Sequence, residues 1–114
     1  MYEYKAVVTR VVNGDTVDCS IDLGFDVHIN QRVRLLGVDA SESRTTHPVE
    51  AEAGLKVKNW LTDKVTNQTV TLKTMYDNRG RFGRVLGTLY LAGNDINAFM
   101  LHAEMVKPYD GSKR

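Results

Sequence analysis

Hydrophobic and polar residues alternate one by one in the first third of the chain, which is the pattern of half-buried β-strands. The segment 5–12 is rich in β-branched residues and stops at Asn13-Gly14, a strong turn signal. A second strand follows, and its alternation places five residues on the face toward the core: Asp15, Val17, Cys19, Ile21 and Leu23. A hairpin at 23–26 then leads into a long third strand over 27–38. We therefore expect a three-stranded meander.

The second half of the chain introduces a helical period. Apolar residues recur at helical spacing from Val49 to Val65, with Glu and Lys between them, which predicts an amphipathic helix. Two more strands are predicted near 70–74 and over 85–91, and Asn94 or Asp95 is placed to cap a last helix ending near residue 104. Five short strands with a helix between the third and the fourth are the element order of an OB-fold, a five-stranded Greek-key barrel. The predicted fold is mainly β with two or three helices, in one domain over residues 1–114.

Composition and charge narrow the classes of function. The chain is 42% hydrophobic and 25% charged, as ordinary globular proteins are, and Lys plus Arg (15) barely exceed Asp plus Glu (14). The chain therefore lacks the strong positive field that drives non-specific duplex binding, and any contact with nucleic acid must be local. The single Cys19 is expected to be a small buried apolar residue, and the Cys and His residues lack zinc-type spacing.

The start of the chain bears on where the protein works. It carries charge where a signal peptide needs an apolar run, and no segment approaches membrane-spanning length. We therefore expect an intracellular protein with no membrane partner.

Asp15 breaks the pattern of its strand. It belongs to the row that should face the core, where an unpaired carboxylate carries a heavy desolvation penalty, so it needs a cation or hydrogen bonds. The alternative is that Asp15 caps the Asn-Gly turn by accepting from nearby backbone amides.

The segment 34–42 ends the third strand with one arginine, Arg34, and two carboxylates, Asp39 and Glu42. A meander brings the start of its second strand near the end of its third, so Asp15 and Asp39 would share a divalent cation with loop carbonyls and waters. In a regular strand Arg34 lies on the face opposite Asp39, and both reach one site only if the strand bends or bulges near Gly37. The alternatives are solvated loop carboxylates and a surface arginine paired with an acid on a neighbouring strand.

Arg84 opens the predicted strand at 85–91, beside Gly83. Planar guanidinium groups match the oxygens of a phosphodiester two at a time, while carboxylates supply hard ligands for a metal. Phosphodiester hydrolysis is therefore the leading interpretation of these charges together. A solvated arginine at a strand end, in a simple basic loop, is the alternative for Arg84.

Three motifs carry a resemblance to the staphylococcal nuclease (thermonuclease) family. They are Asn13-Gly14-Asp15-Thr16-Val17, the run from Arg34 to Glu42, and Gly80-Arg81-Phe82-Gly83-Arg84-Val85-Leu86. The match covers nearly the whole chain in the same order. The resemblance implies an OB-fold nuclease that needs Ca²⁺, cuts DNA and RNA and leaves 3′-phosphates.

The resemblance also implies roles for particular residues. The metal ligands would be Asp15, Asp39 and the carbonyl of Ala40; the catalytic residues would be Arg34, Glu42 and Arg84; and the substrate-binding residues would be Arg81, Phe82 and Tyr109. Glu42 would orient or deprotonate the attacking water, and the two catalytic arginines would hold the phosphate and stabilise its growing charge.

Two rival interpretations stay open. Relatives of this nuclease also serve as non-catalytic modules that bind single-stranded nucleic acid or a protein partner. In the second rival interpretation, the protein is a structural OB domain in which these charged side chains form an ion-pair cluster around water. For the nuclease, we expect a monomer acting on single-stranded or locally opened DNA and RNA, which a phage or a plasmid could encode.

Overall fold

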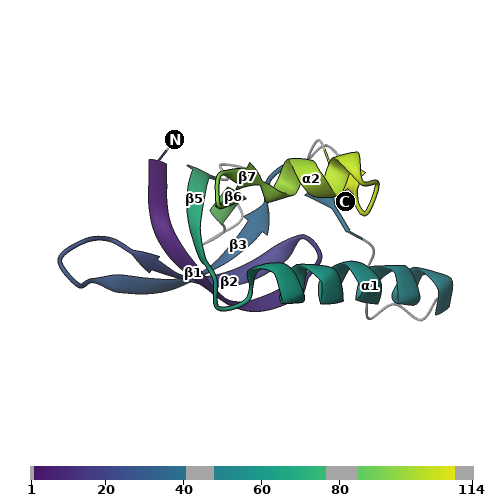
Figure 1. Cartoon of the computed structure of the whole chain (residues 1–114), viewed down its shortest axis with the longest axis horizontal. Coiled ribbons are helices and arrows are strands. Elements are labelled where there is room, and N and C mark those ends of the chain that lie inside the picture. Colours follow the sequence, from purple (N-terminus) through teal and green to yellow (C-terminus); the bar gives the residue numbers. More distant parts are fainter. Residues whose placement is uncertain (1, 41–47, 77–84, 110–114) are drawn as a thin grey trace.

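A closed five-stranded barrel forms the body of the molecule (Figure 1), and the computed structural model describes residues 2–40, 48–76 and 85–109. Its strands are β1 (Tyr2–Asn13), β2 (Thr16–Asp22), β3 (His28–Leu35), β5 (Thr69–Tyr76) and β6 (Val85–Leu91). Neighbouring strands run antiparallel in the order β3-β2-β1-β5-β6, and β6 then pairs in parallel with β3 to close the ring. The predicted OB-like barrel is confirmed.

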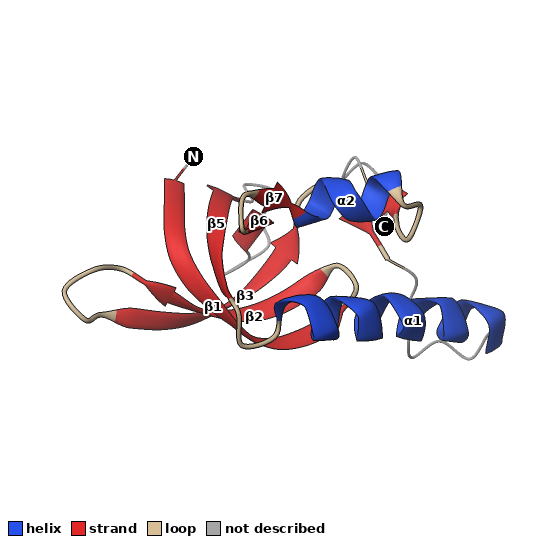
Figure 2. Cartoon of the chain, in the orientation of Figure 1, coloured by secondary structure: helices blue, strands red, loops and turns tan. Residues whose placement is uncertain are grey.

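The described residues form two helices, which flank the barrel (Figure 2). The longer one, α1 (Pro48–Val65), lies between the third and fourth barrel strands in sequence, as predicted. The shorter one, α2 (Ile96–His102), follows the two-residue strand β7 (Asn94–Asp95). Two further short strands, β4 (Val38–Asp39) and β8 (Lys107–Pro108), pair with each other outside the barrel.

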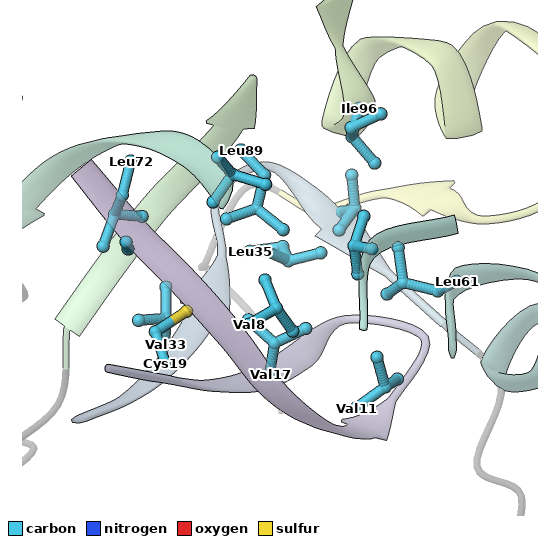
Figure 3. Packing of buried hydrophobic residues seen from close by; sticks show 14 of the residues in the cluster. Val8, Val11, Val17, Cys19, Val33, Leu35, Leu61, Leu72, Leu89 and Ile96 are labelled. Carbon is cyan, nitrogen blue, oxygen red and sulfur yellow. The ribbon is translucent and has the colours of Figure 1, made fainter. Parts of the chain in front are cut away.

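Aliphatic side chains from every barrel strand fill the interior (Figure 3). Val8, Val17, Val33, Leu35, Leu72 and Leu89 are all fully buried. Helix α1 adds Leu61 and Val65, and α2 adds Ile96 and Met100, so each helix closes part of the barrel. Each of these large side chains removes about 1.5–3 kcal/mol of unfavourable hydration when buried.

The hairpin between β2 and β3 extends beyond the barrel (Figure 1). The predicted inward row of β2 is correct as far as Ile21, but Leu23 is 44% exposed, so its assignment to the core was wrong. The reason is geometric. Leu23 lies beyond the end of the barrel, where no strand or helix of the described part of the chain packs against that face of the hairpin (Figure 1). Val49 is likewise exposed, so it does not contribute to the core face of α1 although it fits the helical spacing.

The predicted third strand over 27–38 is interrupted. β3 ends at Leu35, a turn occupies Leu36 and Gly37, and β4 starts at Val38. Gly37 has a φ of +80°, which glycine adopts without steric cost and which breaks the extended backbone. The chain therefore changes direction at the glycine between Arg34 and Asp39.

The ends of the other elements agree with the sequence signals to within a few residues. β1 starts at Tyr2 and ends at Asn13, longer at both ends than the predicted 5–12. Asp95 caps α2, because its carboxylate accepts a hydrogen bond from the amide of Ala98 at 2.8 Å. The helix ends at His102, two residues before the predicted limit at Glu104. Neither described helix is long and apolar enough to span a membrane.

Candidate active site

Asp15 lies in the tight turn between β1 and β2, with its carboxylate folded toward the protein. The residue is only 7% exposed. One carboxylate oxygen accepts a 2.9 Å hydrogen bond from the Thr16 hydroxyl, and the other accepts a 3.1 Å hydrogen bond from the amide of Ala40. Asp15 was expected to need a cation or hydrogen bonds, and the structure shows the hydrogen bonds.

Arg34, on the last part of β3, faces the same carboxylate. Its Nη1 lies 3.3 Å from Asp15 Oδ2, and the two side chains are 12% and 10% exposed. The same nitrogen donates to the carbonyl of Val38 at 2.9 Å, across the turn at Gly37. The bend at the glycine thus joins Arg34 to the segment after it, as the sequence required for a shared site.

The segment from Val38 to Ala40 completes this cluster. The amide of Ala40 donates to the Asp15 carboxylate. Ala40 follows Asp39 in the chain, so this bond holds the segment after β4 against Asp15. On the other side, β8 pairs with β4, with Asp39 opposite Lys107. Asp15, Arg34 and Ala40, together with Asp39, which precedes Ala40 in the chain, are hereafter called the Asp15 cluster.

Tyr109 covers the guanidinium of Arg34. Its ring centroid lies 4.9 Å from Arg34 Cζ, in cation–π geometry, and its amide donates to the carbonyl of Gly37 at 2.9 Å. Tyr109, for which the resemblance implies substrate binding, therefore lies at the cluster. In this structure its ring contacts the arginine.

Gly14 permits the close approach of α1 and Ala40 to the turn. A Cβ at this position would lie 2.5 Å from Val57 Cγ1 and 2.9 Å from Ala40 Cβ, both too short for carbon atoms. The glycine of the Asn-Gly turn therefore serves a packing requirement next to Asp15 as well as the turn itself.

Four predicted site residues lie outside the described residues: Glu42, Arg81, Phe82 and Arg84. Their roles remain predictions.

The chemistry of the cluster suits a hard divalent cation. Asp15, Asp39 and the Ala40 carbonyl are oxygen donors of the kind that Ca²⁺ takes together with waters. Within residues 2–40, 48–76 and 85–109, no three Asp, Glu, His or Cys side chains gather into a ligand set, so a cation here would need a backbone carbonyl and waters besides two carboxylates. Flexible coordination with several waters is ordinary for Ca²⁺, and the residues present fit it.

Asp18 and Cys19 have shifted pKa values and lie away from the cluster. Arg32 is bonded to Asp18 at 2.8 Å on the outer face of the sheet and lowers the pKa of that carboxyl. Burial raises the pKa of the Cys19 thiol to about 12. Cys19 is thus buried and protonated at neutral pH, as expected of a structural cysteine.

One buried polar residue was not singled out from the sequence. Asn97 is 4% exposed and lies on the buried side of α2 with Ile96 and Met100. Its amide bonds to the carbonyl of Leu36, beside Gly37. The available signal was an amide among apolar residues at helical spacing, because such a group must find partners when it is buried.

Comparison with known proteins places the chain in a family. Residues 32–112 match the model of the staphylococcal nuclease homologue family. A protein of Escherichia coli described as an uncharacterized endonuclease is 32% identical over 108 residues, which are 90% of this chain and 60% of that protein. A thermonuclease of Staphylococcus intermedius is 32% identical over 91 residues, which are 80% of this chain and 51% of that protein. The chain therefore spans little more than half the length of these relatives.

Proposed function

This chain belongs to the staphylococcal nuclease homologue family, and from that premise we propose that it is a Ca²⁺-dependent endonuclease that hydrolyses phosphodiester bonds of DNA and RNA. We propose further that it leaves 3′-phosphates. The names of the two relatives, endonuclease and thermonuclease, support the reaction class.

One observation carries the proposal, namely the position of the Asp15 carboxylate. This buried group, in the turn that starts β2, contacts Arg34 from the end of β3 and the amide of Ala40 after β4. The three come from separate elements, and a bend at Gly37 is needed to bring them together. The structure thus brings together a carboxylate, a guanidinium and the backbone of Ala40, whose carbonyl is the proposed third ligand, and such a set suits a cation bound next to a phosphate.

The proposed roles follow from this placement. Asp15, Asp39 and the Ala40 carbonyl would hold the cation, which when bound supplies Lewis-acid polarisation of a phosphate oxygen and a water. Arg34 would hold the phosphate and stabilise charge that grows toward the transition state. Tyr109 would support Arg34 through its ring and present an aromatic edge to the nucleotide.

Residues beyond the described part complete the proposed reaction. Glu42 would orient or deprotonate the attacking water, and Arg84 would be the second arginine on the phosphate. Arg81 and Phe82 would contact the nucleotide. Arg84 precedes Val85, the first residue of β6, which pairs with Val33 next to Arg34.

The test is digestion of single-stranded and duplex DNA and of RNA with Ca²⁺, with Mg²⁺ and with a chelator. Wild type is compared with Asp15→Asn, Arg84→Ala and Glu42→Gln, each expected to fold and to lose about a hundredfold or more in rate. Asp18→Asn is the matched control, because Asp18 lies on β2 just after the turn that holds Asp15, is partly exposed, and pairs with Arg32 outside the cluster. End-group analysis of the products tests the 3′-phosphate.

A second candidate is a non-catalytic module that binds single-stranded nucleic acid or a protein. The observation in its favour is that Arg34 is already bonded to Asp15 and Val38, so protein acceptors alone satisfy part of the guanidinium. Oligonucleotide binding by folded protein, with no cleavage under any of the three metal conditions, would establish the module and refute the nuclease.

A further inference from the structure

The parallel pairing of β3 with β6 ends at the turn that shapes the Asp15 cluster. The ladder runs from Val33 opposite Val85 to Leu35 opposite Gly87, after which the amide of Leu36 still donates to the Gly87 carbonyl at 2.8 Å. Beyond this bond β3 gives way to the turn at Gly37. The carbonyl of Leu36 thus needs a partner that β6 does not supply.

Asn97 supplies that partner from helix α2. Its Nδ2 donates to the Leu36 carbonyl at 2.9 Å and to the Gly87 carbonyl at 3.2 Å, and its Oδ1 accepts from the Leu89 amide at 3.3 Å. The side-chain amide therefore extends the ladder by one step, as a backbone peptide group would. Only a primary amide of this length offers two donors and an acceptor in this arrangement.

The bonded carbonyl lies at the middle of the turn that Arg34 spans. Arg34 Nη1 donates to the carbonyl of Val38, so Leu36 is the centre of the five-residue segment that this bond closes. The next residue, Gly37, accepts from the amide of Tyr109. Asn97 thereby holds the turn to β6 on one side, and the backbone of Tyr109 holds it on the other.

We propose that Asn97 is a positioning residue for phosphodiester hydrolysis, an inference that rests on the proposed function. By fixing the Leu36 carbonyl to β6 it sets the placement of the Arg34 guanidinium and of the Asp39-Ala40 segment. Without the amide, the Leu36 carbonyl and the Leu89 amide would be buried without this partner, and the turn would move to reach water. A displacement of the turn would move the Arg34 guanidinium away from the phosphate, which should weaken binding of the transition state more than binding of the substrate.

The experiment compares Asn97→Ala with Met100→Ala. Met100 is fully buried on the same face of α2 and its side chain is apolar, so its removal weakens the helix packing without releasing the turn. Both variants are assayed well below their unfolding midpoints. Amide hydrogen exchange is read at Leu36 and Tyr109, and at Val8, whose amide bonds to Gln68 away from the turn.

Hydrogen exchange, kcat and KM of Asn97→Ala are each compared with those of the control, Met100→Ala. Exchange at Leu36 rises about tenfold or more while exchange at Val8 stays as in Met100→Ala. The value of kcat falls about tenfold, and KM stays within about twofold. Asn97→Ser, which keeps one hydroxyl donor, falls between wild type and Asn97→Ala in both measurements, and it replaces Asn97→Ala if that variant does not fold.

The two possible failures are distinguishable. If wild type cleaves DNA and the Asn97 and Met100 variants lose kcat equally at equal folded fraction, the positioning role is overturned and the nuclease proposal stands. If wild type cleaves nothing, the proposed function is refuted, and with it the positioning role in hydrolysis.

Discussion

Removing Arg34 should destabilise the fold, because it leaves the Asp15 carboxylate buried without its counter-charge. Breaking a buried ion pair from one side costs about 3–5 kcal/mol. Asp15 keeps two donors, the Thr16 hydroxyl and the Ala40 amide, so the cost of Arg34→Met should lie at the lower limit, about 3 kcal/mol. Methionine preserves much of the apolar stem, so lost packing adds little.

A double-mutant cycle isolates the pair from the other contacts of each residue. Urea unfolding of wild type, Arg34→Met, Asp15→Asn and the double variant should give a coupling free energy of about 1–3 kcal/mol, with unchanged m-values. The Asp18–Arg32 pair gives the control cycle, since its side chains are 27% and 60% exposed, against 10% and 12% for Asp15 and Arg34. Its coupling should be smaller, because solvent screens exposed charges. The reasoning is refuted if the two cycles give the same coupling.

Three further predictions follow from the backbone and the core. Glu104 follows α2 with a φ of +57°, so Glu104→Gly should relieve about 1 kcal/mol of backbone strain and raise the urea midpoint; an unchanged or lower midpoint would contradict this. The pKa of the Cys19 thiol is about 12 in the folded protein against an ordinary 9.0, so the unfolded chain loses this proton first. The thiol's contribution to stability is complete below about pH 9 and falls by up to about 1.4 kcal/mol per pH unit toward pH 12, so urea midpoints should decline less steeply for Cys19→Ala. Gly14→Ala should cost about 1–3 kcal/mol by overpacking against Val57 and Ala40 and should lower nuclease activity; a wild-type thermal midpoint with wild-type turnover would show that the contact yields freely.

The barrel was predictable because its strands are half buried, and half burial leaves a period of two in the sequence. The inward row of β2 could be identified residue by residue as far as Ile21. The row failed at Leu23 because alternation reports local geometry, whereas burial depends on whether another strand lies opposite. Periodicity cannot tell how far a hairpin extends past the barrel.

The break at Gly37 was harder to place, although the sequence allowed for it. Val38 continues the apolar run of β3, so the hydrophobic pattern predicted one long strand. Gly37 was the local residue that indicated a bend. The need for Arg34 and Asp39 to share a site gave the stronger argument for that bend. The carboxylate and the arginine could be singled out as charges that break the pattern of their strands. The bonds from Ala40 and Asn97 could not, because a backbone amide carries no sequence signal and a helix amide does not reveal its partner.

The closure of β3 against β6 also bears on the order in which we expect the molecule to fold. Asp15, Arg34 and Ala40 belong to one contiguous meander, which has mostly local pairings and should form early. The β1–β5 and β3–β6 pairings instead join segments on either side of α1, so their loop-closure entropy is lost before the contacts of the paired strands compensate for it. We therefore expect the kinetic barrier to lie at these two pairings, with the meander formed before them. The arginine and the carboxylate would meet first, and the final geometry of the turn would be set only when β6 and α2 arrive.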